Sequence, residues 1–157
     1  MKILPILLIG GLVFVSTTEI VAGADDANSQ ILLQKIKADK KLVVAGNMGL
    51  TDEEARKFWP LYEEYQKELE RLNLKLGETI REYAAAYNKG PLSDDTAKKL
   101  MDEALSVEES ETNLKRTYAG KIGKVIPAAK TARYIQIENK IRAMLRAELA
   151  QEIPLIP

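Results

Sequence analysis

Apolar side chains recur at helical spacing along most of the chain, and the pattern predicts four helices. Gly and Pro residues separate them, at Gly46, at Gly90-Pro91 and at Pro127. The alternation typical of strands is not found. The expected helices cover residues 29–45, 51–88, 93–126 and 127–153, with Gly46-Asn47 ending the first.

The most regular pattern lies in the second helix, where apolar residues repeat every 11 positions. Three interleaved sets make up this stripe: Phe58, Leu69 and Ile80; Leu61, Leu72 and Tyr83; Tyr65, Leu76 and Tyr87. Eleven residues in three turns is about 3.67 residues per turn, so the stripe stays on one face for about 45 Å. We therefore expect this helix to pack lengthwise against another long helix.

Capping signals mark where the helices begin. Thr51-Asp52-Glu53-Glu54 has the form of a capping box, in which a Thr hydroxyl and a Glu carboxylate each accept an unpaired backbone N–H. Ser93 is expected to cap the third helix, and Pro127 to start the fourth at its first helical position. Two residues disturb the second helix: Pro60 predicts a bend near Arg56, and Gly77 a close helix approach or a flexible point.

The third helix has one polar residue on its apolar stripe. The stripe consists of Ala97, Leu100, Ala104, Val107, Leu114, Tyr118, Ile122 and Val125. Glu111 occupies the position between Val107 and Leu114, and we expect either a salt bridge to Lys115 or an exposed stretch of the stripe. In the fourth helix the expected buried row is Tyr134, Ile137, Ile141, Leu145 and Leu149.

An apolar tail, Ile153-Pro154-Leu155-Ile156-Pro157, follows the fourth helix. Its two prolines argue against helix, and we expect it to cover part of the core or of a dimer interface. The predicted fold is all-α, an elongated antiparallel bundle or hairpin of about four helices. A homodimer is expected to bury the remaining apolar faces.

The first 24 residues have the pattern of an export signal. Met1-Lys2 is followed by 13 uncharged, mostly apolar residues, and then by the small-residue site Ala22-Gly23-Ala24. The alternative is a membrane anchor, but a spanning helix needs about 20 apolar residues. We expect cleavage after Ala24, leaving residues 25–157 as a single all-helical domain in the periplasm, with no stable membrane insertion.

Composition then narrows the function. The chain has 23 basic and 23 acidic side chains, and this balance argues against nucleic-acid binding. With no Cys and no His it lacks the side chains of nucleophilic triads and of the usual zinc sites. The opposite charges four apart, Asp52 with Arg56, Glu63 with Lys67 and Glu138 with Arg142, are typical of solvated helix faces.

We therefore expect no enzymatic activity, no catalytic residue and no cofactor. A metal site formed by carboxylates such as Glu108, Glu109 and Glu111 is not favoured, because hard cations need several converging oxygens.

Aromatic residues are the candidates for contact with another protein. Trp59 lies about 100° around the helix from Phe58, off the main stripe. It either covers the core against another helix or remains exposed to grip apolar segments of a partner. The candidate contact residues are Trp59, Tyr62, Tyr83 and Tyr87.

The order of these features resembles the Spy/CpxP family of periplasmic helical proteins, whose hallmark is a pair of L-T-x-x-Q motifs. Leu50-Thr51-Asp52-Glu53-Glu54 is similar to the first motif, with Glu54 in place of Gln. Where the second is expected, the chain has Ile126-Pro127-Ala128-Ala129-Lys130. The resemblance spans Gly49 to Ile153 and implies a small, exported, often dimeric all-α protein with a thin cradle shape.

The resemblance also implies a function. Members are ATP-independent chaperones or modulators of envelope-stress signalling, and related ones bind metal through histidines, which this chain lacks. We expect a periplasmic, non-enzymatic, stress-related protein that binds unfolded or envelope proteins. The alternatives are a regulatory module docking on the periplasmic domain of a membrane sensor, and a metal-responsive relative.

Overall fold

The computed structural model describes residues 39–156, which fall into two units, residues 39–49 and residues 50–156. The first unit is helical over residues 39–48 and ends at Gly49, whose φ of 55° is left-handed. The predicted stop at Gly46-Asn47 is therefore wrong. Gly46 continues the helix, and the Asn47 side chain donates to the Val43 carbonyl at 2.8 Å. The expected signal segment, residues 1–24, and residues 29–38 of the first predicted helix lie outside the described residues.

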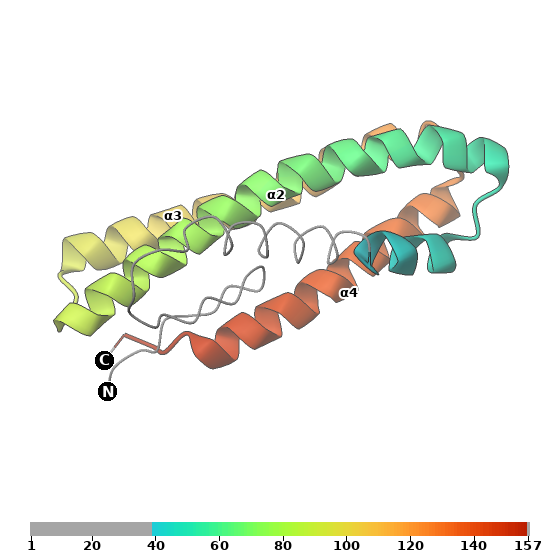
Figure 1. Ribbon diagram of the computed structural model, residues 1–157. Coiled ribbons are helices and arrows are strands. Elements are labelled where there is room, and N and C mark those ends of the chain that lie inside the picture. Colours follow the sequence, from blue (N-terminus) through green and yellow to red (C-terminus); the bar gives the residue numbers. More distant parts are fainter. Residues whose placement is uncertain (1–38, 157) are drawn as a thin grey trace, which may run out of the picture. The chain divides into compact units, whose positions relative to one another are not determined.

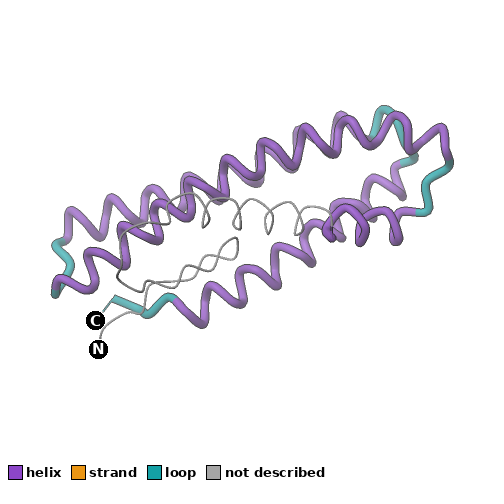
Figure 2. The backbone as a smooth tube through the Cα atoms, viewed as in Figure 1, coloured by secondary structure: helices purple, strands orange, loops and turns teal. Residues whose placement is uncertain are grey.

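The second unit contains three long helices (Figure 1). They are α2 (Asp52–Lys89), α3 (Asp94–Ile122) and α4 (Ala128–Glu152). Residues 39–156 include no strand, as Figure 2 shows, so the all-α prediction is confirmed. None of the helices within this range is long and apolar enough to span a membrane.

Local signals set the starts of these helices as predicted, within one residue, but α3 ends at Ile122, four residues before its expected end. At α2 the Thr51 hydroxyl accepts from the Glu54 N–H at 3.3 Å, and the Glu54 carboxylate accepts from the Thr51 N–H at 2.8 Å. The Ser93 hydroxyl accepts from the Thr96 N–H at the start of α3. Pro127 occupies the N-cap position of α4, so this helix begins at Ala128, one residue later than expected.

α2 and α3 form an antiparallel hairpin and lie side by side (Figure 1). The short connection between them needs Gly90, whose φ is 132°. The buried faces come from the predicted stripes. They include Phe58, Tyr65, Leu69 and Ile80 of α2, and Leu100, Val107, Tyr118 and Ile122 of α3.

α4 packs on this hairpin mainly through its first half. Its buried residues are Thr131, Tyr134 and Glu138, and none of residues 139–152 is buried. The predicted buried row is therefore only partly correct, since Tyr134 is buried but Ile137, Ile141, Leu145 and Leu149 are half-buried. Glu138, the residue after Ile137, is buried instead, and its carboxylate accepts a hydrogen bond from the Gln66 side chain of α2. The second half of α4 keeps an incompletely covered apolar face.

Candidate protein-binding site

The packed end of the unit is an aromatic cluster contributed by all three helices. Its rings are those of Phe58, Trp59, Tyr62, Tyr65, Tyr118 and Tyr134. The Tyr134 ring of α4 lies 5.1 Å from Phe58 and 6.1 Å from both Tyr62 and Tyr65, mostly edge to face. Burial raises the pKa of Tyr62, Tyr65 and Tyr134, so these hydroxyls stay protonated.

The structure separates the four predicted contact residues into two pairs. Tyr62 is only 2% exposed and belongs to the core, and Trp59 is half-buried at the edge of the same cluster. Tyr83 and Tyr87 lie near the other end of α2, about 36 Å from Trp59 along the helix. Their rings are 5.9 Å apart and both are half-buried. Of the four residues, only Tyr83 and Tyr87 therefore lie far from the aromatic cluster, near the C-terminal end of α2.

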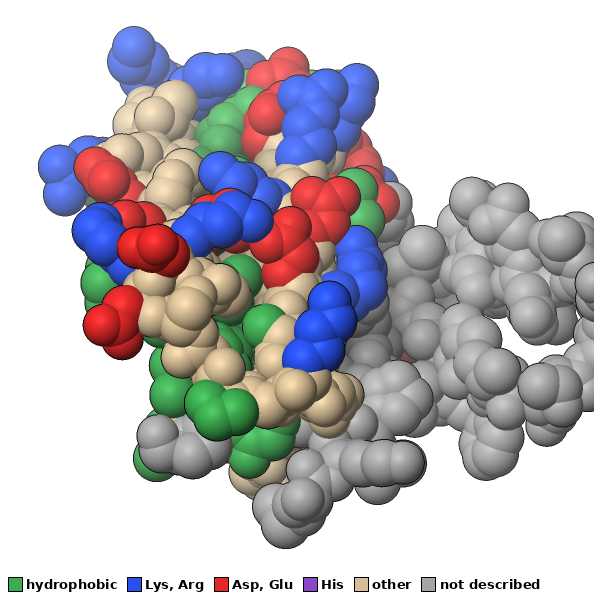
Figure 3. Space-filling model, turned by 90° about the vertical axis from the view of Figure 1, so that its left-hand side faces the viewer, with side chains coloured by type: hydrophobic (Ala, Val, Ile, Leu, Met, Phe, Trp, Pro, Cys, Tyr) green, Lys and Arg blue, Asp and Glu red, His purple; other side chains and the backbone are tan. Residues whose placement is uncertain are grey.

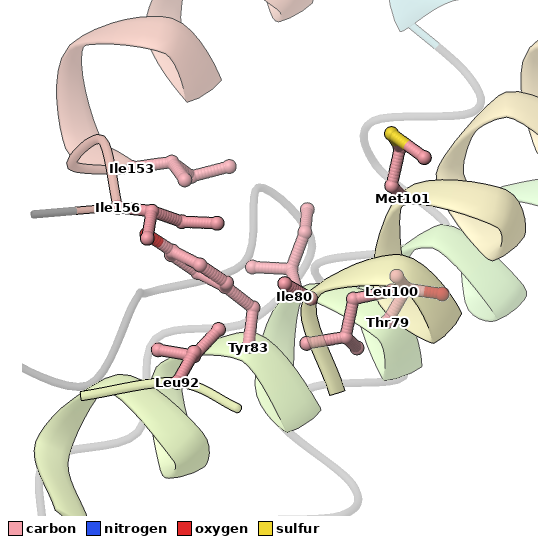
Figure 4. Close-up of a pocket in the computed structure, with 9 residues that line it drawn as sticks. Thr79, Ile80, Tyr83, Leu92, Leu100, Met101, Ile153 and Ile156 are labelled. Carbon is pink, nitrogen blue, oxygen red and sulfur yellow. The ribbon is translucent and has the colours of Figure 1, made fainter. Parts of the chain in front are cut away.

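An apolar groove lies beside Tyr83, where the apolar tail returns toward the hairpin. We call it the tail groove, a cavity of about 220 Å³. Its lining residues are Thr79, Ile80, Tyr83, Leu92, Ala97, Leu100, Met101, Ile153 and Ile156. Figure 4 shows Tyr83 reaching from α2 toward Ile156, with Ile80 and Leu100 on the opposite wall. The Tyr83 hydroxyl donates to the Pro154 carbonyl at 2.8 Å.

A second cavity, of about 150 Å³, continues the tail groove between α4 and the hairpin. The two cavities share Ile80 and Ile153, and the second also has Leu145 and Leu149 of α4 in its lining. Leu145 and Leu149 belong to the row of α4 that the sequence predicts to be buried, but the structure leaves both half-buried. An apolar surface therefore runs along the second half of α4 and ends at the apolar tail.

Exposed apolar side chains and paired charges surround this surface. Met101 is 55% exposed, and Met144 on α4 is 71% exposed. Lys99 pairs with Glu82 at 2.5 Å across the hairpin, and the two residues directly precede Leu100 and Tyr83 in the sequence. Seen from the end at which α2 passes to α3, side chains of both charges are interspersed with apolar ones (Figure 3). The mixed charges around the apolar surface therefore favour neither cationic nor anionic partners.

A buried ion pair holds α4 at the inner end of the second cavity. Glu111 of α3 is 3% exposed, and its Oε2 lies 2.7 Å from Nε and 2.5 Å from Nη2 of Arg142. Arg142 also donates from Nη1 to Asn73 of α2 at 2.8 Å, so one guanidinium joins three helices. Burial alone raises the pKa of Glu111, but Arg142, Lys115 and Arg146 together hold that pKa below its usual value.

The expected salt bridge between Glu111 and Lys115 is confirmed, at 3.5 Å, but it is the longer contact. The alternative, an exposed stretch of the stripe, is wrong because Arg142 covers the carboxylate. The expectation that Glu138 and Arg142 lie on a solvated face is also wrong. Glu138 is buried and accepts from the Gln66 side chain at 2.9 Å, next to Tyr134.

Sequence reasoning missed Thr79, Leu92 and Met101 of the groove. It named the other lining residues only as members of the apolar stripes or of the tail, and it predicted no groove. The apolar tail was recognised, but its position depends on where α4 ends relative to the hairpin. The one signal in the sequence was the length of the apolar row on α4, which continues beyond the residues that α3 can cover.

No group of three or more acidic side chains close enough to hold a metal ion occurs among residues 39–156. The chain matches no protein-family model, and neither a curated protein nor a solved structure is detectably similar to it.

Proposed function

We propose that this chain is an exported, non-enzymatic protein that binds unfolded or partly folded envelope proteins without ATP. A periplasmic location, removal of residues 1–24 and a homodimer belong to the same proposal. The resemblance to Spy/CpxP proteins, carried by the Leu50–Glu54 motif and the proline-led start of α4, supports this direction.

The incompletely covered second half of α4 is the observation that carries the proposal. None of residues 139–152 is buried, although Ile141, Leu145 and Leu149 form an apolar row, of which Leu145 and Leu149 line the second cavity. A protein with no further partner gains free energy by closing such a surface, at about 25 cal/mol per Å² of apolar area. An open apolar surface next to a packed aromatic core is therefore a site for another polypeptide.

The composition of the site suits many loosely bound partners. Methionine is unbranched and polarizable, and it adapts to differently shaped apolar surfaces. Met101 is the exposed methionine in the wall of the tail groove, and Met144 precedes Leu145 of the second cavity in the sequence of α4. Around them the charges are paired, as Lys98 is with Asp102 at 2.6 Å, and such pairs discriminate little between clients. These features favour unfolded apolar segments over one specific folded partner.

The test is suppression of client aggregation by the full chain, purified after export from a bacterial host. Met101→Asp puts a charge on the wall of the tail groove, and Leu74→Asp is the matched control. Leu74 is similarly exposed, at 63% against 55% for Met101, but lines neither cavity. We expect Met101→Asp to raise the protein concentration needed for half suppression by at least about threefold. A change of this size corresponds to the loss of roughly one apolar contact with the client. Leu74→Asp should leave it unchanged.

Wild-type chain that suppresses the aggregation of none of several clients would contradict the proposal. Equal losses in both variants would place client binding elsewhere on the surface. A single tight partner captured from envelope extract, without suppression of aggregation, would instead favour the regulatory module.

Mass spectrometry of the purified chain also gives its first residue, and a start at Asp25 is expected.

A further inference from the structure

The prolines of the apolar tail explain why its backbone is extended rather than helical. α4 ends at Glu152, and Ile153 adopts an extended backbone with φ −92° and ψ 110°. A residue before proline is driven to this conformation because helical geometry would clash with the proline ring. Residues 154–156 are not helical, so the tail leaves α4 as an extended segment.

The tail groove holds this segment by few contacts. Ile153 and Ile156 line the cavity, and the Tyr83 hydroxyl donates to the Pro154 carbonyl at 2.8 Å (Figure 4). Yet Ile156 remains 52% exposed and Leu155 is 89% exposed. About 220 Å³ of the groove is left unfilled beside the segment. The segment is thus seated but incompletely buried, and ordering its backbone opposes its own binding.

These contacts do not depend on the sequence of the segment that occupies the groove. The Tyr83 hydroxyl donates to a main-chain carbonyl, a group that every residue carries. The wall opposite Tyr83 is formed by Ile80, Leu100 and Met101, which accept any apolar side chain of suitable size. The nearby Lys99 is neutralised by Glu82, so an uncharged segment is not disfavoured.

We infer that the tail groove is a peptide-binding site and that the tail is its internal competitor. The ligand class is an extended apolar segment of another polypeptide, chemically like the Ile-Pro-Leu-Ile sequence of the tail itself. Such a segment displaces Ile153 and Ile156 and accepts the hydrogen bond of Tyr83. The inference deepens the proposed function and rests on it, because it identifies how a client segment is held and what keeps the site closed without one.

The experiment uses a fluorescent peptide with the sequence of residues 152–157 and measures its binding to the full chain by anisotropy. Ile156→Asp weakens the hold of the tail, and Leu155→Asp is the matched control, since the neighbouring Leu155 does not line the groove. If the tail occupies its site about 90% of the time, releasing it strengthens apparent peptide affinity by about tenfold. We expect this gain for Ile156→Asp and an unchanged affinity for Leu155→Asp.

A second substitution tests the hydrogen bond. In the Ile156→Asp chain, Tyr83→Phe keeps the ring and removes the donor, and we expect peptide affinity to fall about threefold to tenfold. No binding of the peptide to any variant, or equal binding to wild type, Ile156→Asp and Leu155→Asp, would overturn the inference.

Aggregation assays on the same variants separate this inference from the proposed function. Peptide binding that rises with Ile156→Asp, without suppression of aggregation by any variant, would leave the groove as a peptide site and remove the chaperone function. Suppression by wild type, with peptide affinity unaffected by Ile156→Asp, would retain the function and overturn the role of the tail.

Discussion

At the scale of single residues, buried charges decide how α4 sits on the hairpin. The Glu111 carboxylate is almost inaccessible to water, and its charge is compensated by Arg142 from a helix 31 residues further along the chain. Spacing rules identify partners one turn away, and they identified Lys115 correctly. They cannot identify a partner that depends on the rotation of another helix, which is why the stronger contact was not predicted.

Removing one member of this pair leaves the other charge buried. We expect Glu111→Gln to lower the free energy of unfolding by about 3 kcal/mol, measured by urea denaturation at pH 7. The control is Glu53→Gln, which removes an exposed pair with Lys57 and should cost less than about 1 kcal/mol. Equal effects of the two substitutions would show that Glu111 is solvated.

The same pair of measurements in acid tests the charge directly. Because the folded-state pKa of Glu111 lies below its usual value of 4.5, the ionised carboxylate stabilises the fold fully above about pH 4.5. That contribution is lost as the pH falls through the folded-state pKa. The difference in stability between wild type and Glu111→Gln should therefore shrink in acid, and a constant difference would contradict the ionic origin of the effect.

At the scale of the helices, local sequence predicted the starts well and the burial less completely. The capping box at Thr51 and the serine cap at Ser93 involve only neighbouring residues, so they can be recognised without the fold. The spacing of Ile137, Ile141 and Leu145 shows that they share one face of α4. It does not show what covers that face, and the structure leaves these residues half-buried.

The turn between α2 and α3 provides a test at this scale. Gly90 has φ 132° and ψ −159°, a region that essentially only glycine occupies. We expect Gly90→Ala to lower the free energy of unfolding by about 1–3 kcal/mol in thermal or urea denaturation. No atom lies within 4 Å of the added methyl group, so the effect is one of backbone strain.

Gly120 is the matched control for that substitution. It is exposed in the last turn of α3, and a methyl group there also meets nothing within 4 Å. Gly120→Ala should leave stability unchanged or raise it by up to about 0.5 kcal/mol, because alanine has the higher helix propensity. A loss of stability in both variants would point to an unrecognised contact rather than to the φ of Gly90.

At the scale of the whole molecule, the sequence predicted the fold class because three long apolar stripes allow only helix-on-helix packing. The position of the tail groove was not predicted, because it depends on how far α4 diverges from the hairpin. The resemblance to Spy/CpxP proteins, the location and the oligomeric state stay predictions.

A homodimer is the prediction that belongs to this scale. Apolar side chains such as Leu105 on α3 and Met144 on α4 remain exposed, and a second copy would remove them from water. Light scattering coupled to size exclusion, on the chain purified after export, should give twice the mass of one chain. A monomer would mean that the exposed apolar residues serve partners other than a second copy, and it would end the proposal of a cradle-like dimer.

The uneven packing of α4 has a consequence for the lifetime of the protein. A helix that is anchored at Tyr134, Glu138 and Arg142 but has no buried residue beyond them opens locally from its far end, well before the molecule unfolds. Proteases cleave such opened segments in proportion to how often they are open. A bound client segment would hold α4 closed, so occupied molecules would outlast idle ones. Turnover would then adjust the amount of the protein to the load of its clients.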